Sequence, residues 1–231
     1  MYPRLVIDLK KVKNNLDRIT EMVKGSGCSL MIVTKGASAD MEVYKLLNES
    51  DIDYIADSRI QNLKKYEGTG KERVLLRLPM NSETDQVVKY ADISLNSELK
   101  TIRNLDEAAK KQGKVHKIIL MIDLGDLREG IFFKNEDEIF NAVEEILKLK
   151  NIELFGIGVN LTCYGAVIPK KDNLSILVEI ARKIEKKFGI KLQMISGGNS
   201  SSIHLIGKGE LPEGINNLRV GEAFLLGGET A

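Results

Sequence analysis

The sequence has no tryptophan, few aromatic residues and no excess of charge of either sign. Aromatic residues make up 5% of its 231 residues, and 34 basic side chains are balanced by 33 acidic ones. A nucleic-acid surface normally needs a basic patch with interleaved aromatic side chains. We therefore expect no nucleic-acid partner.

Cysteines and long apolar runs are scarce as well. Cys28 and Cys163 are the two cysteines of the sequence, and their spacing fits neither a metal site nor a disulfide framework. We expect both to be partly buried, reduced thiols and expect no metal. The N-terminal MYPRLVIDLKK lacks the apolar core of a signal peptide, and no apolar run approaches membrane length. The sequence thus predicts a cytoplasmic protein with no membrane partner.

What is present fits one large soluble domain. Hydrophobic residues make up 43% of the chain and charged residues 29%, so a sizeable core can be buried. No linker-like stretch divides the chain, and its length is typical of a (β/α)8 barrel.

Apolar periodicity predicts alternating strands and helices. Apart from a short strand at 4–8, strands are expected at 30–33, 53–57, 73–78, 92–95, 116–124, 153–160, 192–196 and 218–223. Helices are expected at 9–24, 41–48, 58–66, 82–90, 97–112, 135–149, 173–188 and 200–206. This alternation favours a closed parallel barrel of the (β/α)8 TIM-like class, with a doubly wound open sheet as the alternative.

The stretch SLMIVTKGASAD brings a single lysine to a strand end. The apolar run 30–33 is typical of a buried parallel strand, and Lys35 and Gly36 follow it almost at once. An amine at the mouth of the core is well placed for imine chemistry. The alternative is a lysine that ends a strand and extends to solvent.

Further polar residues follow other predicted strands, as expected of a site on the C-terminal face of a barrel. They are Asp57, Asn96, the run DLGDLREG at 123–130, Asn160, the run SGGNSSS at 196–202, and Arg219. In SGGNSSS, backbone N–H groups and a helix start converge, which predicts a phosphate cradle. A flexible turn is the alternative.

Four of these elements occur in one order: Lys35, then DLGDLREG, then SGGNSSS, then LRVGEA with Arg219 and Gly221. Over essentially the whole chain, this pattern resembles the pyridoxal-phosphate barrel of alanine-racemase-like enzymes. The resemblance implies pyridoxal 5'-phosphate as cofactor and racemisation of a small amino acid as activity.

The resemblance also implies roles for single residues. Lys35 resembles the Schiff-base lysine and one of the two proton-transfer bases. Arg128 resembles the arginine directed at the cofactor's phenolic oxygen and the substrate carboxylate, and Arg219 the partner of the pyridine nitrogen. The other cofactor-binding residues expected are Asn160, Gly198, Asn199, Ser200, Ser201 and Gly221.

Three departures point to a substrate other than alanine. Gly36 to Ala39 replace a tyrosine-containing motif, Met121 replaces a lysine, and Asn160 replaces a histidine. The segments DLGDLREG, LTCYG and SGGNSSS look more like the ornithine racemase subgroup. Asp126 stands where the family has methionine, and either pairs with the distal ammonium of ornithine or lysine or is a solvated aspartate that balances Arg128.

The resembling enzymes continue into a β domain that supplies a tyrosine, the second base, to the partner subunit. We therefore expect residues 1–231 to be the N-terminal barrel of a full-length homodimer. Alone, this barrel should bind cofactor yet racemise poorly, with Tyr164 the first candidate base inside it and His204 in the phosphate helix. The alternative is a single-domain carrier protein for pyridoxal-phosphate homeostasis. Its HxxGxLQxNK motif is missing here, which favours the racemase.

Overall fold

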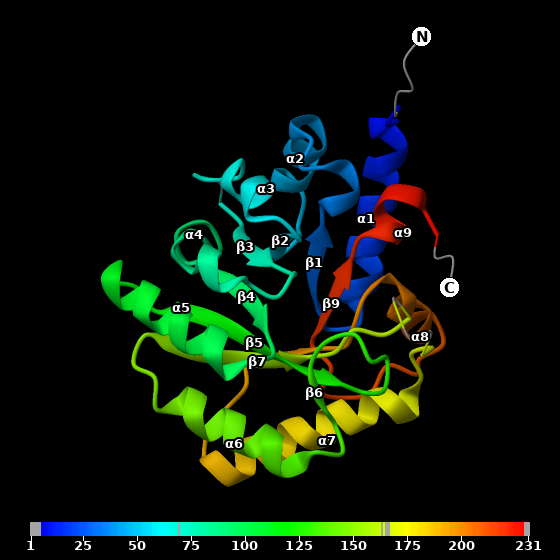
Figure 1. The fold of residues 1–231 in the computed structure, drawn as a ribbon. Helices are drawn as coiled ribbons and strands as arrows, with labels where there is room; N and C mark the ends of the chain where they lie inside the picture. Colours follow the sequence, from blue (N-terminus) through cyan, green and yellow to red (C-terminus); the bar gives the residue numbers. More distant parts are fainter. Residues whose placement is uncertain (1–5, 69, 163, 165–166, 229–231) are drawn as a thin grey trace.

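Eight parallel strands close into a barrel in the computed structural model, which describes residues 6–68, 70–162, 164 and 167–228 (Figure 1). They are β1 (Ser29–Val33), β2 (Tyr54–Asp57), β3 (Glu72–Leu75), β4 (Ile93–Asn96), β5 (His116–Asp123), β7 (Ile152–Gly158), β8 (Met194–Ser196) and β9 (Asn217–Val220). β1 pairs with both β2 and β9, and the pairing of β4 with β5 completes the ring. The predicted (β/α)8 barrel is confirmed, and the open-sheet alternative is wrong.

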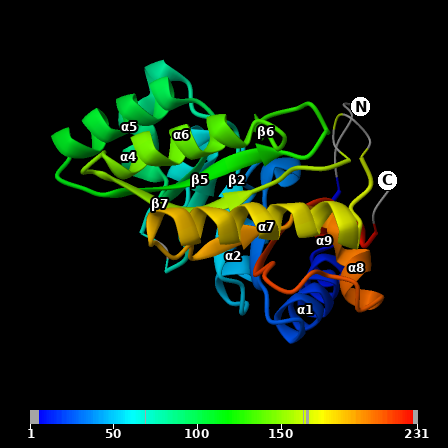
Figure 2. The same cartoon turned by 90° about the horizontal axis from the view of Figure 1, so that it is seen from below.

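Helices surround the strands on the outside (Figure 1), and α7 crosses them in the view from below (Figure 2). The helices are α1 (Leu9–Gly25), α2 (Met41–Asn48), α3 (Ile60–Lys64), α4 (Thr84–Tyr90), α5 (Leu99–Lys111), α6 (Glu136–Leu147), α7 (Lys171–Phe188), α8 (Ile203–Gly207) and α9 (Glu222–Leu226). Three 3-10 turns accompany them: η1 (Lys35–Ala37), η2 (Asn81–Glu83) and η3 (Ser200–Ser202).

The barrel has an inner and an outer apolar layer. Along β1, Met31 and Val33 belong to the inner cluster, whereas Leu30 and Ile32 belong to the layer between strands and helices. Because successive side chains of a strand point to opposite faces, a strand buried on both faces must be apolar throughout. This explains the continuous run before Lys35.

Several elements differ from the prediction; among them, the strand predicted at 73–78 ends at Leu75, and the helix predicted at 200–206 is divided into η3 and α8. Residues 6–8 form no strand, and Asp8 instead caps α1; residues 4–5 lie outside the described part of the chain. The predicted strand 218–223 ends at Val220, and α9 begins at Glu222. A two-residue strand, β6 (Ile131–Phe132), pairs with the end of β5 and was not predicted.

Of the two cysteines, Cys28 is a buried free thiol whose pKa is raised by that burial. Cys163 lies outside the described residues. Among the helices of the described residues, none is both long and apolar enough to cross a membrane.

Candidate active site

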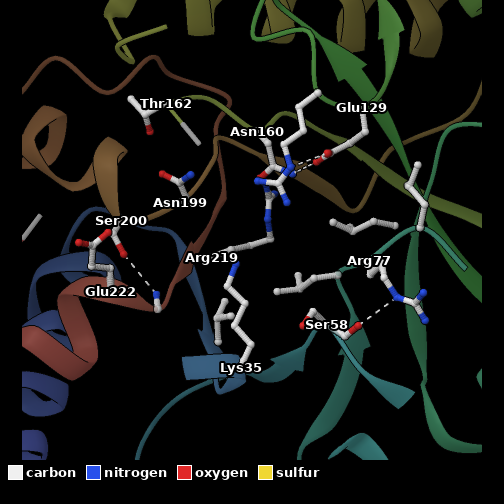
Figure 3. A pocket seen from close by; sticks show the side chains of 16 residues that line it. Lys35, Ser58, Arg77, Glu129, Asn160, Thr162, Asn199, Ser200, Arg219 and Glu222 are labelled. Atoms are coloured by element: carbon white, nitrogen blue, oxygen red, sulfur yellow. Dashed lines mark hydrogen bonds and ion pairs between the residues drawn. The ribbon is translucent and has the colours of Figure 1, made fainter. Parts of the chain in front are cut away.

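A cavity of about 670 Å³ opens where the strands end, and most of the predicted site residues line it (Figure 3). Seven of the nine lie in its wall: Lys35, Arg128, Asn160, Asn199, Ser200, Arg219 and Gly221. They come from segments that follow β1, β5, β7 and β8 and from β9 itself. The closed barrel therefore brings together residues that are up to 186 positions apart, from Lys35 to Gly221.

Lys35 is presented by the 3-10 turn η1, directly after β1. Thr34 fixes this turn, because its backbone N–H donates to Ala56 O at 2.8 Å and its hydroxyl donates to Asp57 Oδ2 at 2.8 Å. The Lys35 side chain extends into the cavity (Figure 3) and is exposed. Within the described residues, its Nζ makes no hydrogen bond or ion pair, so the amine is available to a ligand.

Arg219 is the most enclosed cation of the cavity, with 2% of the residue exposed. Its guanidinium donates to Ser196 Oγ, to Val159 O at 2.5 Å and to Asn160 Oδ1 at 2.7 Å. A guanidinium keeps its proton under all ordinary conditions, so these acceptors hold a permanent positive charge in the wall.

Asn160 connects Arg219 to a carboxylate that the sequence argument missed. Its Nδ2 donates to Glu129 Oε1, and Glu129 Oε2 pairs with Arg128 Nε at 2.8 Å. The Glu129 side chain is 12% exposed and lines the cavity. The sequence did contain an indication that Glu129 belongs to the site, because this residue stands next to Arg128 within the same strand-end run.

The structure contradicts both hypotheses for Asp126. The residue is 1% exposed, so it is not a solvated aspartate. Its two carboxylate oxygens accept from the backbone N–H groups of Tyr164 and Val167 at 3.2 and 3.3 Å, and it does not line the cavity. Asp126 therefore holds the loop after β7 in place and is not positioned to select a substrate side chain.

Hydrogen-bond donors gather at the end of the cavity beside α9. Ser200 Oγ accepts from the backbone N–H groups of Gly221 and Ala223, both at 3.2 Å. A Cβ on Gly221 would lie 3.0 Å from Val33 Cβ, so a side chain at this position would require Val33 or the backbone after β9 to shift by a few tenths of an ångström. Both N–H groups thus converge on Ser200 Oγ, and the hydroxyl proton of Ser200 can be donated to a phosphate.

Gly198 and Ser201 do not line this cavity. Gly198 accepts from Arg219 N at 2.9 Å and has φ +107°, a conformation that favours glycine. The Ser201 hydroxyl contacts Thr162 and Asn199 and faces a second cavity of about 500 Å³.

Neither Tyr164, the first candidate for a second base, nor His204 lines the larger cavity. The Tyr164 side chain belongs to a residue that is 75% exposed. His204 lies in the wall of the second cavity, where its Nδ1 donates to Ser201 O at 2.6 Å.

Comparison with known families gives a match over nearly the whole chain. Residues 7–227 match the family model described as alanine racemase, N-terminal domain. The chain belongs to this family.

Two curated relatives are racemases of diamino acids by name. The chain is 55% identical over 231 residues to the ornithine racemase of Acetoanaerobium sticklandii, covering 100% of this chain and 65% of the relative. It is 39% identical over 229 residues to the lysine racemase of Thermotoga maritima, covering 98% of this chain and 63% of the relative. The chain therefore spans somewhat less than two thirds of either relative.

Two solved structures share the fold. The alanine racemase of Clostridium difficile 630 matches with a TM-score of 0.78 and 21% identity, covering 97% of this chain and 58% of that one. PipY of Synechococcus elongatus matches with a TM-score of 0.74 and 16% identity, covering 93% of this chain and 99% of that one.

Proposed function

We propose that this chain is the cofactor-binding barrel of a pyridoxal-phosphate-dependent racemase that acts on a diamino acid such as ornithine. The observation that carries the proposal is the Lys35 amine, which has no partner among the described residues and extends into a cavity with the Ser200 hydroxyl at one end. The names of the two curated relatives support the substrate class.

The residues present fit the cofactor. Lys35 would hold it covalently, while the Ser200 hydroxyl, which the N–H groups of Gly221 and Ala223 orient, would bind its phosphate. Arg219 would face the ring nitrogen and, because a guanidinium does not release its proton, would leave that nitrogen unprotonated. When bound, pyridoxal phosphate supplies an electron sink for negative charge at the substrate Cα.

The proposed roles of the other groups follow from their charge. Arg128 would bind the substrate carboxylate, and Lys35 would move a proton on one face of Cα. Racemisation needs a base on each face, so Lys35 serves one of them. For the other face we keep the prediction of a tyrosine from a further domain of the partner subunit in a homodimer.

A carrier role is the second candidate. The barrel fold shared with PipY, whose structure was solved without PLP, is compatible with this role as well. A carrier would bind the cofactor through Lys35 and leave amino acids unchanged.

The test has two stages. First, the purified protein loaded with cofactor should show the absorbance band of lysine-bound pyridoxal phosphate, and borohydride should fix the label on Lys35. Lys35→Ala should lack the band, whereas Lys45→Ala, which removes an exposed lysine of α2 paired with Glu42, should keep it. A Lys35→Ala protein with an unchanged band would contradict the assignment.

The second stage separates racemase from carrier. The loaded protein is incubated with L-ornithine, L-lysine, L-alanine and L-serine, and each enantiomer is measured by chiral chromatography. Formation of D-ornithine or D-lysine supports the racemase. Cofactor binding with no interconversion, also when the gene's full-length product is used, would favour the carrier.

A further inference from the structure

The cavity holds a carboxylate whose use the proposed function has not explained. Glu129 is 12% exposed at its side chain, and within the part of the chain that the structure describes each of its oxygens accepts a single donor, from Asn160 or from Arg128. A carboxylate offers about four acceptor sites. Glu129 can therefore take a further donor from the cavity without losing these two.

The Glu129 carboxylate and the proposed phosphate-binding end lie on opposite sides of the cavity. Figure 3 shows Glu129 and Arg77 on one side of Arg219, and Ser200 and Glu222 on the other. Because the phosphate donors gather at Ser200, the cofactor would extend from that end toward Lys35. Glu129 is then on the side where the substrate's own side chain would lie.

Arg128 and Glu129 together match the charges that distinguish a diamino acid. The substrate brings a carboxylate and a distal ammonium, and the pair presents a cation and an anion side by side at 2.8 Å. We infer that Glu129 is the residue that binds the distal ammonium of the substrate, while Arg128 takes the carboxylate. This inference rests on the proposed function and adds the residue that determines its specificity.

The burial of Glu129 strengthens the preference for a substrate side chain that carries an ammonium group. A carboxylate that is nearly excluded from water gains more from an ammonium than an exposed one does, because charge-assisted hydrogen bonds are stronger when water does not compete. A substrate without the distal ammonium would cover Glu129 and leave it with the contacts it already has. The site should therefore reject an apolar side chain of equal length.

Ornithine and norvaline provide the matched ligands, since norvaline is ornithine without its terminal amine. Binding of each to the cofactor-loaded protein is titrated through the change in cofactor absorbance, which does not require turnover. In Glu129→Gln we expect ornithine to bind about 10-fold to 100-fold more weakly, the usual range for removing a charged partner. Norvaline should change by no more than about two-fold.

Glu83→Gln is the matched control. Glu83 is also paired with an arginine of the cavity, Arg77, at 2.6 Å, and its side chain is 13% exposed, but it does not line the cavity. This variant should keep the ratio of ornithine to norvaline affinity. Glu129→Asp keeps the charge and should retain part of the preference, which guards against a general loss of structure in Glu129→Gln.

The outcomes separate this inference from the proposed function. An equal loss for ornithine and norvaline in Glu129→Gln, or equal affinities in the unchanged protein, would overturn it. If Glu129 sets the preference in binding but no D-amino acid forms, also with the gene's full-length product, the racemase proposal fails and the inference stands. If ornithine is racemised and Glu129→Gln keeps the same preference, the inference fails and the racemase stands.

Discussion

At the scale of single residues, two adjacent serines have different surroundings. Ser200 and Ser201 are each 5% exposed. Ser200 Oγ accepts two backbone N–H groups and Ser200 lines both cavities, whereas Ser201 lines only the second. Their equal burial makes them a matched pair for testing where the phosphate binds.

We predict that Ser200→Ala weakens pyridoxal-phosphate affinity about 10-fold or more, because the phosphate loses a charge-assisted hydrogen bond. Ser201→Ala should change the affinity by no more than about two-fold. Fluorescence titration of the cofactor-free proteins measures both constants. An equal or larger loss in Ser201→Ala would move the phosphate toward the second cavity.

The sequence was informative about strand ends and uninformative about side-chain direction within loops. Lys35 and Arg219 could be predicted because each stands at or next to the end of a buried strand. The loop 124–130 contains two carboxylates, Asp126 and Glu129, and only Glu129 reaches the cavity. Positive φ angles at three positions of this loop reorient the chain repeatedly, and residue spacing does not reveal them; they are Gly125, Leu127 and Gly130.

At the scale of elements, the start of α1 shows how a short polar residue overrides a local strand pattern. Apolar residues before Asp8 favour a strand by composition, yet the Asp8 carboxylate accepts from the N–H groups of Lys10 and Lys11 at 3.0 and 3.2 Å. This is an N-cap, which satisfies two donors that the helix itself cannot.

Near the C-terminal end of the described residues, periodicity does not assign a short apolar run to strand or helix. The strand predicted to reach Ala223 therefore ends earlier in the structure, at Val220.

We predict that Asp8→Ala lowers the free energy of unfolding by about 1 kcal/mol, the usual value of an N-cap. Asp17→Ala, on the same helix, removes an exposed i,i+4 pair with Lys13 and should cost less than about 0.5 kcal/mol. Urea denaturation followed by circular dichroism measures both. If the two variants lose equal stability, the Asp8 cap contributes no more than a surface ion pair.

At the scale of the whole molecule, closure of the barrel was predictable from the count of eight alternating units. The order of pairing around the ring follows, because sequential parallel strands are joined by outer helices. The polar contacts that support the ring from outside were not predictable, since they depend on which side chains of neighbouring strands face each other. The contact between β4 and β5 is one of these.

His116 begins β5, is 2% exposed, and has its Nε2 2.9 Å from Ser94 Oγ on β4. Ser94 Oγ also accepts from Asn96 Nδ2 at 2.9 Å. Burial lowers the pKa of His116 to about 4, from about 6.5 in an unfolded chain. The folded barrel therefore holds this histidine neutral.

The pH dependence of the protein's stability follows from the difference between the His116 pKa in the folded and in the unfolded chain. Between pH 6.5 and pH 4 the unfolded chain binds the proton and the folded chain does not, so acid favours unfolding. His116 should reduce the free energy of unfolding by about 3 kcal/mol over this interval, at about 1.4 kcal/mol per pKa unit.

Urea denaturation at a series of pH values should show a shallower loss of unfolding free energy in His116→Gln than in the unchanged protein, although the variant starts from lower stability at pH 7. His204→Gln, which removes the other histidine of the sequence and keeps His116, should retain the steep loss. Parallel pH profiles for His116→Gln and the unchanged protein would show that the buried ring does not control acid unfolding.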